Sequence, residues 1–230
     1  MSSNDSMDQQ SFDRTGYTIA PSILTASECD KLLSHIKEAS IDKAGARNLL
    51  QLDWCKSLAV SLKQNSAISH LLPPDAVAVQ CTLFVKSPEK NWLVTLHQDL
   101  SIPVQERIDD PACSGWSEKE GVLYTQPPAS VLDGLVAVRV HLDECGLDNG
   151  PLRVAPGSHR LGRLTDADMA ENRERFIEAP CPVPRGGALI MRPLLLHASS
   201  KSRSQSSRRV LHFVFGPAAL PYGLKWRFAI

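Results

Sequence analysis

Residues 92–100 read Trp-Leu-Val-Thr-Leu-His-Gln-Asp-Leu, an apolar stretch rich in β-forming residues that ends in His97-Gln98-Asp99. In an extended strand, side chains at positions i and i+2 project from the same face, so His97 and Asp99 can bind one metal ion while Gln98 faces the other way. His197 adds a second imidazole one hundred residues later. Two imidazoles and one carboxylate form the facial triad of non-haem Fe(II) oxygenases, which leaves coordination positions open for other ligands and for O2.

A second pair with the same spacing, His141-Leu142-Asp143, competes with the first. It is followed by Glu-Cys-Gly-Leu-Asp-Asn-Gly at 144–150, in which Asn-Gly is a strong turn signal, so we expect Asp143 at a solvated strand end. The apolar stretch before His97 would instead carry its ligands into a core. We therefore assign metal binding to His97 and Asp99.

The composition is that of one ordinary globular domain. Hydrophobic residues make up 43% and charged residues 22% of the 230 residues, which suffices for a sizeable core. The formal net charge is zero, so no global field favours nucleic acid or an anionic membrane as a partner. The six cysteines form no CxxC pair, which is typical of a reduced cytosolic protein.

The N-terminus has neither a basic region nor an apolar stretch, and no apolar segment of the sequence approaches the length of a membrane span. We therefore expect a soluble, cytoplasmic protein. The sequence favours neither a monomer nor a homodimer.

The N-terminal third carries helical signals. Residues 1–12 are polar and are expected to form a disordered tail, and residues 13–230 a single domain. Thr25-Ala-Ser-Glu28 is typical of a capping box that begins an amphipathic helix, and a second helical zone covers residues 46–72. From Val77 the hydrophobic period changes to two, which is typical of strands.

Short β-rich segments separated by Gly, Pro and Asn turns dominate the remainder. They lie near residues 76–86, 92–100, 122–125, 131–143, 151–155, 187–192 and 209–216. With helices confined to the N-terminal third, this pattern predicts a mainly β (α+β) fold, a sandwich or jelly roll rather than a βαβ sheet. The long stretch 103–130 is either a lid over a site or a plain excursion, and residues 166–177 are expected on the surface.

Five elements in chain order resemble the phytanoyl-CoA dioxygenase family of Fe(II)/2-oxoglutarate-dependent oxygenases. They are Lys86 with its following loop, His97-Gln98-Asp99, Asn149-Gly-Pro-Leu152, Pro156-Gly-Ser-His159, and His197 with Arg208. The specificity comes from their order and from the eleven-residue step between His197 and Arg208. The resemblance extends from about Phe12 to Phe215 and implies a double-stranded β-helix, a cupin-like jelly roll, which agrees with the strand pattern.

Carried over residue by residue, the resemblance implies that His97, Asp99 and His197 bind Fe(II). It also implies that Arg208 binds the distal carboxylate of the cosubstrate 2-oxoglutarate. Arginine suits this role because its rigid fork of donors matches a carboxylate bidentately. Arg209, the next residue, should face away from the metal in an extended strand.

Five further residues are expected near the cosubstrate or the substrate. Ser199 and Thr82 align with family positions that contact 2-oxoglutarate. Arg139 stands where family members often have an aromatic residue. A guanidinium there would hold a substrate carboxylate or the cosubstrate, or would form a salt bridge with a nearby acidic residue. Trp116 and Tyr124, in the 103–130 stretch, either wall a substrate pocket or belong to ordinary packing.

The implied reaction is hydroxylation of an unactivated C–H bond in a small-molecule substrate, with O2 as the oxidant and succinate and CO2 as products. Asp99 disfavours halogenation, because related halogenases lack this carboxylate. Two alternatives stay open: a non-catalytic binding or sensing member of the same fold, and a cupin-like metal enzyme that does not use 2-oxoglutarate. The sequence does not name the substrate.

The other histidines and the basic run 201–209 receive structural interpretations. His159 is expected to stabilise a turn by hydrogen bonding, and His35, His70 and His212 show no partner pattern. The basic run is expected to be a solvated loop that leads into the Arg208 strand rather than a nucleic-acid site.

Overall fold

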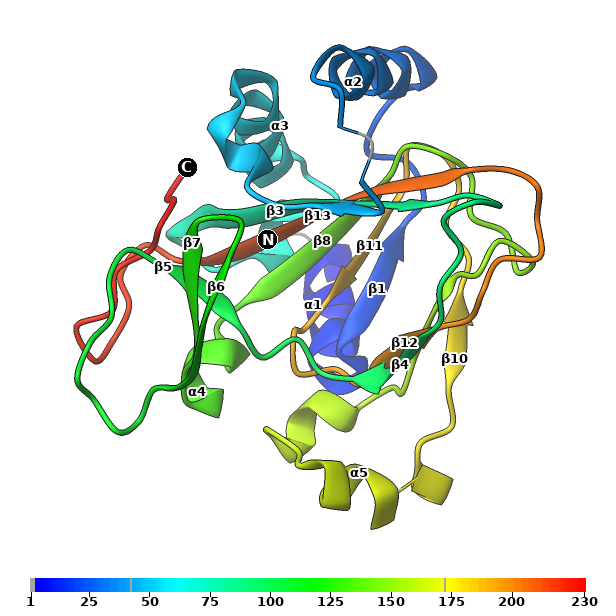
Figure 1. The fold of residues 1–230 in the computed structure, drawn as a ribbon. Helices are drawn as coiled ribbons and strands as arrows, with labels where there is room; N and C mark the ends of the chain where they lie inside the picture. The colour runs from blue at the N-terminus through cyan, green and yellow to red at the C-terminus, as the bar shows by residue number, and fades with distance from the viewer. Residues whose placement is uncertain (1–2, 42, 172) are drawn as a thin grey trace.

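The computed structural model describes residues 3–41, 43–171 and 173–230, and its main feature is a pair of antiparallel sheets that face each other (Figure 1). The larger sheet holds, in order, β1 (Tyr17–Ala20), β11 (Ala188–Met191), β8 (Val136–His141), β13 (Arg208–Pro217), β3 (Ala76–Lys86) and β2 (Gly45–Ala46). The smaller sheet holds β10 (Ala179–Cys181), β9 (Leu152–Val154), β12 (His197–Ser199) and β4 (Val94–His97). The predicted jelly roll is confirmed.

The two faces of the larger sheet serve different purposes. β13 lies between β3 and β8, and its register places Arg208 opposite Lys86, and His212 opposite both Thr82 and Arg139. Because side chains alternate between the faces of a strand, these polar residues share the inner face. The apolar residues at the alternate positions, such as Leu211 and Leu83, point outward into the apolar cluster that forms the main core.

Two helices, α2 (Ala26–Glu38) and α3 (Asp53–Gln64), cover the outer face of the larger sheet (Figure 1). The predicted capping box begins α2: the Thr25 hydroxyl accepts from the Glu28 amide at 3.2 Å, and the Glu28 carboxylate accepts from the Thr25 amide at 2.7 Å. The apolar stripes of both helices pack into the main core through Cys29, Leu32, Ile36, Leu58, Ala59 and Leu62.

The second predicted helical zone, residues 46–72, is helical only in part. α3 is flanked by two short 3-10 turns, η1 (Leu49–Gln51) and η2 (Ser69–Leu71). Asn48 adopts a left-handed conformation with φ of 64°, which prevents a continuous helix from the start of the zone. The apolar spacing there reflects burial of Leu49 and Leu50 of η1 in the main core rather than a long helix.

The expected disordered tail is wrong for the residues that the structure describes, since Ser3–Thr15 form the helix α1. Phe12 is fully buried in the main core, and the Gly157 amide donates to the Thr15 carbonyl at 2.8 Å. Burial of Phe12 therefore fixes α1 to the domain, although most residues of this helix are polar. Residues 1 and 2 lie outside the described residues.

The 103–130 stretch contributes to a third, three-stranded sheet. Its order is β5 (Ile102–Val104), β7 (Val122–Gln126) and β6 (Ser114–Lys119). The expected strand at 131–143 begins instead as the short helix α4 (Ala129–Asp133), because Val131 and Leu132 pack into a separate apolar cluster beside this sheet.

The surface segment expected at 166–177 contains the short helix α5 (Asp166–Glu171) and the 3-10 turn η4 (Arg173–Arg175). Every helix in the described part of the chain is too short or too polar to span a membrane.

Candidate active site

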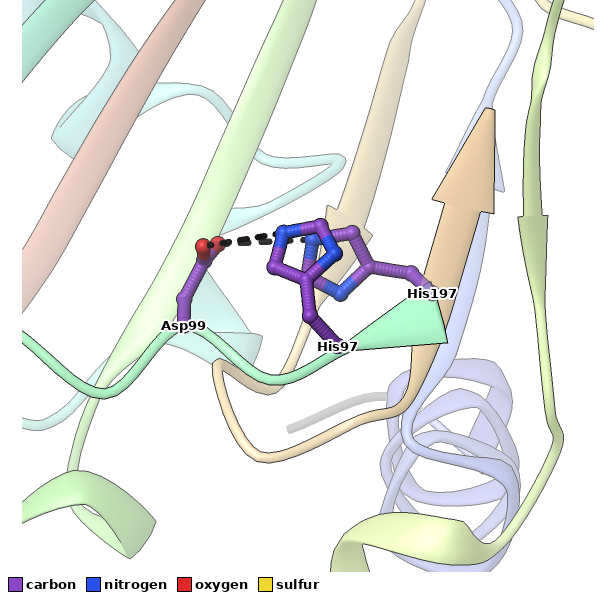
Figure 2. A group of neighbouring side chains, drawn as sticks. All are labelled: His97, Asp99 and His197. Carbon is purple, nitrogen blue, oxygen red and sulfur yellow. Dashed lines mark ion pairs between the residues drawn. The ribbon is translucent and has the colours of Figure 1, made fainter. Parts of the chain in front are cut away.

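Strand pairing brings the two predicted histidine ligands together. β12 and β4 are antiparallel, with His197 directly opposite His97, and the ring centroids lie 4.2 Å apart. Asp99 follows the end of β4, where its amide donates to the Pro193 carbonyl at 2.9 Å. Its carboxylate oxygens lie 3.8 Å from His97 Nε2 and 3.7 Å from His197 Nε2 (Figure 2). One ligand atom from each residue lies within 4.8 Å of the other two.

Backbone contacts orient both imidazoles for metal binding. His97 Nδ1 lies 2.8 Å from the Thr95 carbonyl, and His197 Nδ1 lies 2.8 Å from the Leu195 carbonyl. A carbonyl only accepts, so each Nδ1 carries the proton and each Nε2 presents its lone pair towards Asp99. This tautomer and the hard carboxylate fit Fe(II).

Burial keeps the imidazole of His197 neutral. It lowers the pKa of His197 to about 4, and the attraction of Asp99 offsets this only in part. His197 is therefore a neutral ligand at physiological pH, and no proton has to be displaced from Nε2 before a metal binds.

Gln98 fixes the loop that carries Asp99. As the strand pattern predicted, it points away from the triad: its amide nitrogen donates to the Leu194 carbonyl at 2.7 Å and the Gly162 carbonyl at 2.8 Å. Its side-chain oxygen accepts from the Leu164 amide at 2.8 Å. Three hydrogen bonds thus hold the middle residue of the metal-binding motif in place.

The competing pair, His141 and Asp143, makes no such cluster. The sequence predicted a solvated Asp143. Instead, its carboxylate forms a bidentate ion pair with Arg209, with two contacts of 2.7 Å. This also shows that Arg209 faces away from the triad, as its position beside Arg208 predicted. His141 is buried but is not among the residues that line the cavity at the triad.

Arg208 lies at the other end of the inner face and is almost fully buried. Its Nη1 donates to the Gly150 carbonyl, whereas its Nε is buried and has no partner. Gly150 has φ of +59°, and a Cβ there would lie 2.7 Å from the Ser200 carbonyl oxygen, so glycine is required at this turn. The Asn-Gly turn therefore positions the arginine, which retains donor capacity for an anion.

Lys86 and Ser199 lie beside Arg208. The Lys86 ammonium donates to the Ser199 hydroxyl at 2.7 Å and to the Ser200 carbonyl at 2.6 Å. Burial, and to a smaller extent the nearby Arg208 charge, lowers the pKa of Lys86 to about 8. The lysine is still largely protonated at neutral pH, so two cationic side chains converge at this end of the site.

A cavity of about 340 Å³ joins the triad to these cations. Seven of the sequence-predicted site residues line it: Thr82, His97, Asp99, Arg139, His197, Ser199 and Arg208. Tyr124 lines it as well. Trp116 does not: its ring lies 5.4 Å from the Arg107 guanidinium and packs beside the apolar cluster of the third sheet. For Trp116 the structure therefore favours the alternative of ordinary packing.

The sequence interpretation missed His212, which is 4% exposed and lines the same cavity. Its Nε2 lies 3.8 Å from Asp99 Oδ2, and its Nδ1 lies 2.8 Å from Arg139 Nη1. A usable signal was present. His212 follows Arg208 by four positions in one strand, so the period of two places both side chains on the same face.

Three other histidines lie outside the site. His159 Nε2 lies 3.1 Å from the Asp13 carbonyl and links its turn to α1, in keeping with the structural role expected for it. His35 stacks on Trp54, and His70 lies 3.2 Å from the Ser66 carbonyl.

Known proteins share both the sequence pattern and the fold. The family model described as Phytanoyl-CoA dioxygenase (PhyH) matches residues 12–210. Phytanoyl-CoA dioxygenase domain-containing protein 1 of Danio rerio is 27% identical over 191 residues, which are 77% of this chain and 57% of that protein. The chain thus spans little more than half the length of that relative.

Solved structures agree in fold. The epimerase SnoN, in complex with Fe³⁺, α-ketoglutarate and nogalamycin RO, has a TM-score of 0.71 at 14% identity, covering 96% of this chain and 91% of that chain. EctD from S. alaskensis in its apoform has a TM-score of 0.68 at 19% identity, covering 100% and 86%. The family match over most of the chain confirms the resemblance: the protein belongs to the phytanoyl-CoA dioxygenase family.

Proposed function

We propose that the protein is an Fe(II)- and 2-oxoglutarate-dependent dioxygenase that hydroxylates an unactivated C–H bond of a small-molecule substrate. The observation that carries this proposal is one cavity that contains both the triad and a buried arginine with an unpartnered Nε. Family membership supports the same reaction class.

His97, Asp99 and His197 would hold the iron. Both imidazoles are fixed in the metal-binding tautomer by backbone carbonyls, and Asp99 supplies one negative charge. Bound Fe(II) supplies the chemistry that couples decarboxylation of 2-oxoglutarate, giving succinate and CO2, to oxidation of the substrate by O2. The chain's own part is to hold the reactants in place and to keep bulk water away.

Arg208 would bind the distal carboxylate of 2-oxoglutarate. Its unpartnered Nε gains a hydrogen bond when a carboxylate arrives, and charge-assisted bonds of this kind are roughly twice as strong as neutral ones. Ser199 and Thr82 would provide hydroxyl contacts, since both are buried and line the cavity. Lys86 adds a second cation at the same end.

The 103–130 stretch would act as the lid of the site. Lys119, Tyr124 and Gln126 of its hairpin line the cavity. The hairpin tip is fastened to the neighbouring segment, because Glu120 forms an ion pair of 3.3 Å with Arg47 and its carbonyl accepts from Asn48 at 3.1 Å. Such a lid would limit the access of water during the reaction.

Release of succinate from 2-oxoglutarate tests the function directly, with Arg208→Gln compared against Arg209→Gln as a control of equal charge change. The Fe(II)-loaded wild type is expected to release succinate slowly even without its substrate. Arg208→Gln should raise KM for 2-oxoglutarate by about 10-fold or more while metal binding is kept, and Arg209→Gln should not.

Two outcomes would contradict the proposal. An unchanged KM for 2-oxoglutarate in Arg208→Gln would contradict the assignment of Arg208 to the cosubstrate carboxylate. A folded, metal-loaded wild type with no succinate release and no 2-oxoglutarate binding would favour a binding member of the fold or a metal enzyme that does not use 2-oxoglutarate.

A further inference from the structure

Basic side chains outnumber acidic ones around the cavity. Among the described residues that line it, the basic ones are Arg47, Lys86, Lys119, Arg139 and Arg208, and the acidic one is Asp99. Fe(II) and the 2-oxoglutarate dianion would cancel each other in formal charge, so the proposed cofactors leave this excess unchanged. Three of these cations, Lys86, Arg139 and Arg208, are buried, and buried positive charge without a counter-ion is costly. The imbalance therefore indicates a further anion.

Arg139 is the cation that the cosubstrate site leaves without a partner. It lies on the central strand β8 with 7% of its surface exposed, and it forms no ion pair within the described part of the chain. Its Nη1 donates to His212 Nδ1 at 2.8 Å, and its Nε is buried without a partner. Burial, and to a smaller extent the Arg208 charge, lowers the pKa of Arg139 to about 10, so the guanidinium remains charged at neutral pH.

The guanidinium of Arg139 also lies over an aromatic ring. Its Cζ lies 5.4 Å from the centre of the Phe84 ring, and Phe84 lines the cavity as well. This cation–π contact and one hydrogen bond to His212 leave the other donors of the planar fork for a ligand. A planar fork of this kind matches a carboxylate in bidentate geometry.

Arg139 and Arg208 belong to different rows of the sheet. Arg208 is opposite Lys86, whereas Arg139 is opposite His212, four residues further along β13, or roughly 13 Å along an extended strand. His212 also lies 3.8 Å from Asp99, so the guanidinium that contacts His212 is on the side of the triad. A ligand held by Arg139 would therefore lie beside the metal and not at the distal end of the cosubstrate.

We propose that Arg139, oriented by His212 and Phe84, binds a carboxylate group of the prime substrate, so that the enzyme acts on a small carboxylic acid. This inference rests on the proposed function, because it assigns Arg208 to 2-oxoglutarate. The carboxylate anchor would place the neighbouring carbons of the substrate next to the triad. The exposed Lys119 of the lid hairpin would favour entry of the anion.

The test measures fragment binding to the Zn(II)-loaded protein saturated with 2-oxoglutarate, by ligand-observed NMR. The probes are acetate and benzoate, their neutral amides acetamide and benzamide, and phenyl phosphate. Wild type should bind the carboxylates at least about 10-fold more tightly than the amides. Arg139→Gln and Arg139→Met should lose this preference without a change in 2-oxoglutarate affinity, and the surface variant Arg185→Gln should keep it.

The outcomes separate this inference from the proposed function. If 2-oxoglutarate binds but wild type does not prefer carboxylates, or both Arg139 variants keep the preference, the substrate inference is wrong and the proposed function stands. Weaker 2-oxoglutarate binding in both Arg139 variants would also overturn it, because Arg139 would then serve the cosubstrate. Tighter binding of phenyl phosphate than benzoate would replace the carboxylate by a phosphate ester. If 2-oxoglutarate does not bind to wild type, both proposals fail.

Discussion

His212 connects the metal triad with the arginine of the proposed substrate site. An arginine only donates, so His212 Nδ1 accepts from Arg139 and the proton of the neutral ring lies on Nε2, which faces Asp99. Burial and the Arg139 charge lower the pKa of His212 to about 3, which keeps the ring neutral. His212 thus presents an N–H dipole towards the carboxylate ligand and is a positioning residue for Asp99.

Loss of this dipole should weaken metal binding. His212→Phe is expected to lower the affinity for Mn(II) by about 10-fold, because outer partners of metal ligands commonly contribute at least that much. Calorimetric titration checks this, with His35→Phe as the control, since His35 stacks on Trp54 outside the site. Equal affinities for the two variants would contradict the positioning role.

Single residues could be predicted where strand parity alone decides. The period of two placed His97 with Asp99 and separated Arg208 from Arg209, and both relations hold in the structure. The partners of Arg139 could not be predicted, because they follow from the register of three strands that are far apart in the sequence. His212 could have been predicted from parity, because it follows Arg208 by an even number of positions in β13.

The hairpin of β6 and β7 depends on a contact between two distant segments. Glu120 at its tip binds Arg47 and Asn48, and both Glu120 and Asn48 have positive φ values, at 53° and 64°. Non-glycine residues in this region are uncommon, so the contact holds two strained turns together.

Removal of this contact should loosen the lid without unfolding the protein. Glu120→Ala is expected to speed amide hydrogen exchange within 114–126, while global stability falls by less than about 1 kcal/mol, as for exposed ion pairs. Glu118→Ala, in the same hairpin, serves as the control. Unchanged exchange in Glu120→Ala would show that the hairpin is held by its packing alone.

Elements with local signals could be predicted, and those that depend on tertiary contacts could not. The capping box at Thr25 and Glu28 marks the start of α2 in the sequence itself. α1 carries no comparable signal, because its stability comes from the burial of Phe12. β5 and β6 likewise form only because β7 lies between them.

The whole molecule separates packing from chemistry across one sheet. The outer face of the larger sheet forms the main core with α2 and α3, and the inner face holds the ionisable groups of the cavity. The alternating strands make this division predictable in outline. Burial of ionisable groups on the inner face lowers the stability of the folded protein by an amount that depends on pH.

The metal-free protein should lose stability in acid. His197 and His212 have pKa values of about 4 and about 3 in the folded protein, against 6.5 as the ordinary value, because burial disfavours the charged ring. Below pH 6.5 the unfolded chain binds more protons than the folded one, so the free energy of unfolding falls as the pH falls. Urea midpoints at pH 7.5, 6.0 and 5.0 check this. His212→Phe should show a smaller decline, and a constant wild-type midpoint would contradict the assignment of two buried neutral imidazoles.

The visible spectrum of the anaerobic protein with Fe(II) and 2-oxoglutarate tests the central claim most directly, for wild type, His97→Ala and His141→Ala. Chelation of Fe(II) by the keto acid gives a charge-transfer band. The band is expected in wild type and in His141→Ala, and it should be lost in His97→Ala. A folded, metal-loaded wild type without the band, or loss of the band in His141→Ala alone, would contradict the site assigned to His97, Asp99 and His197.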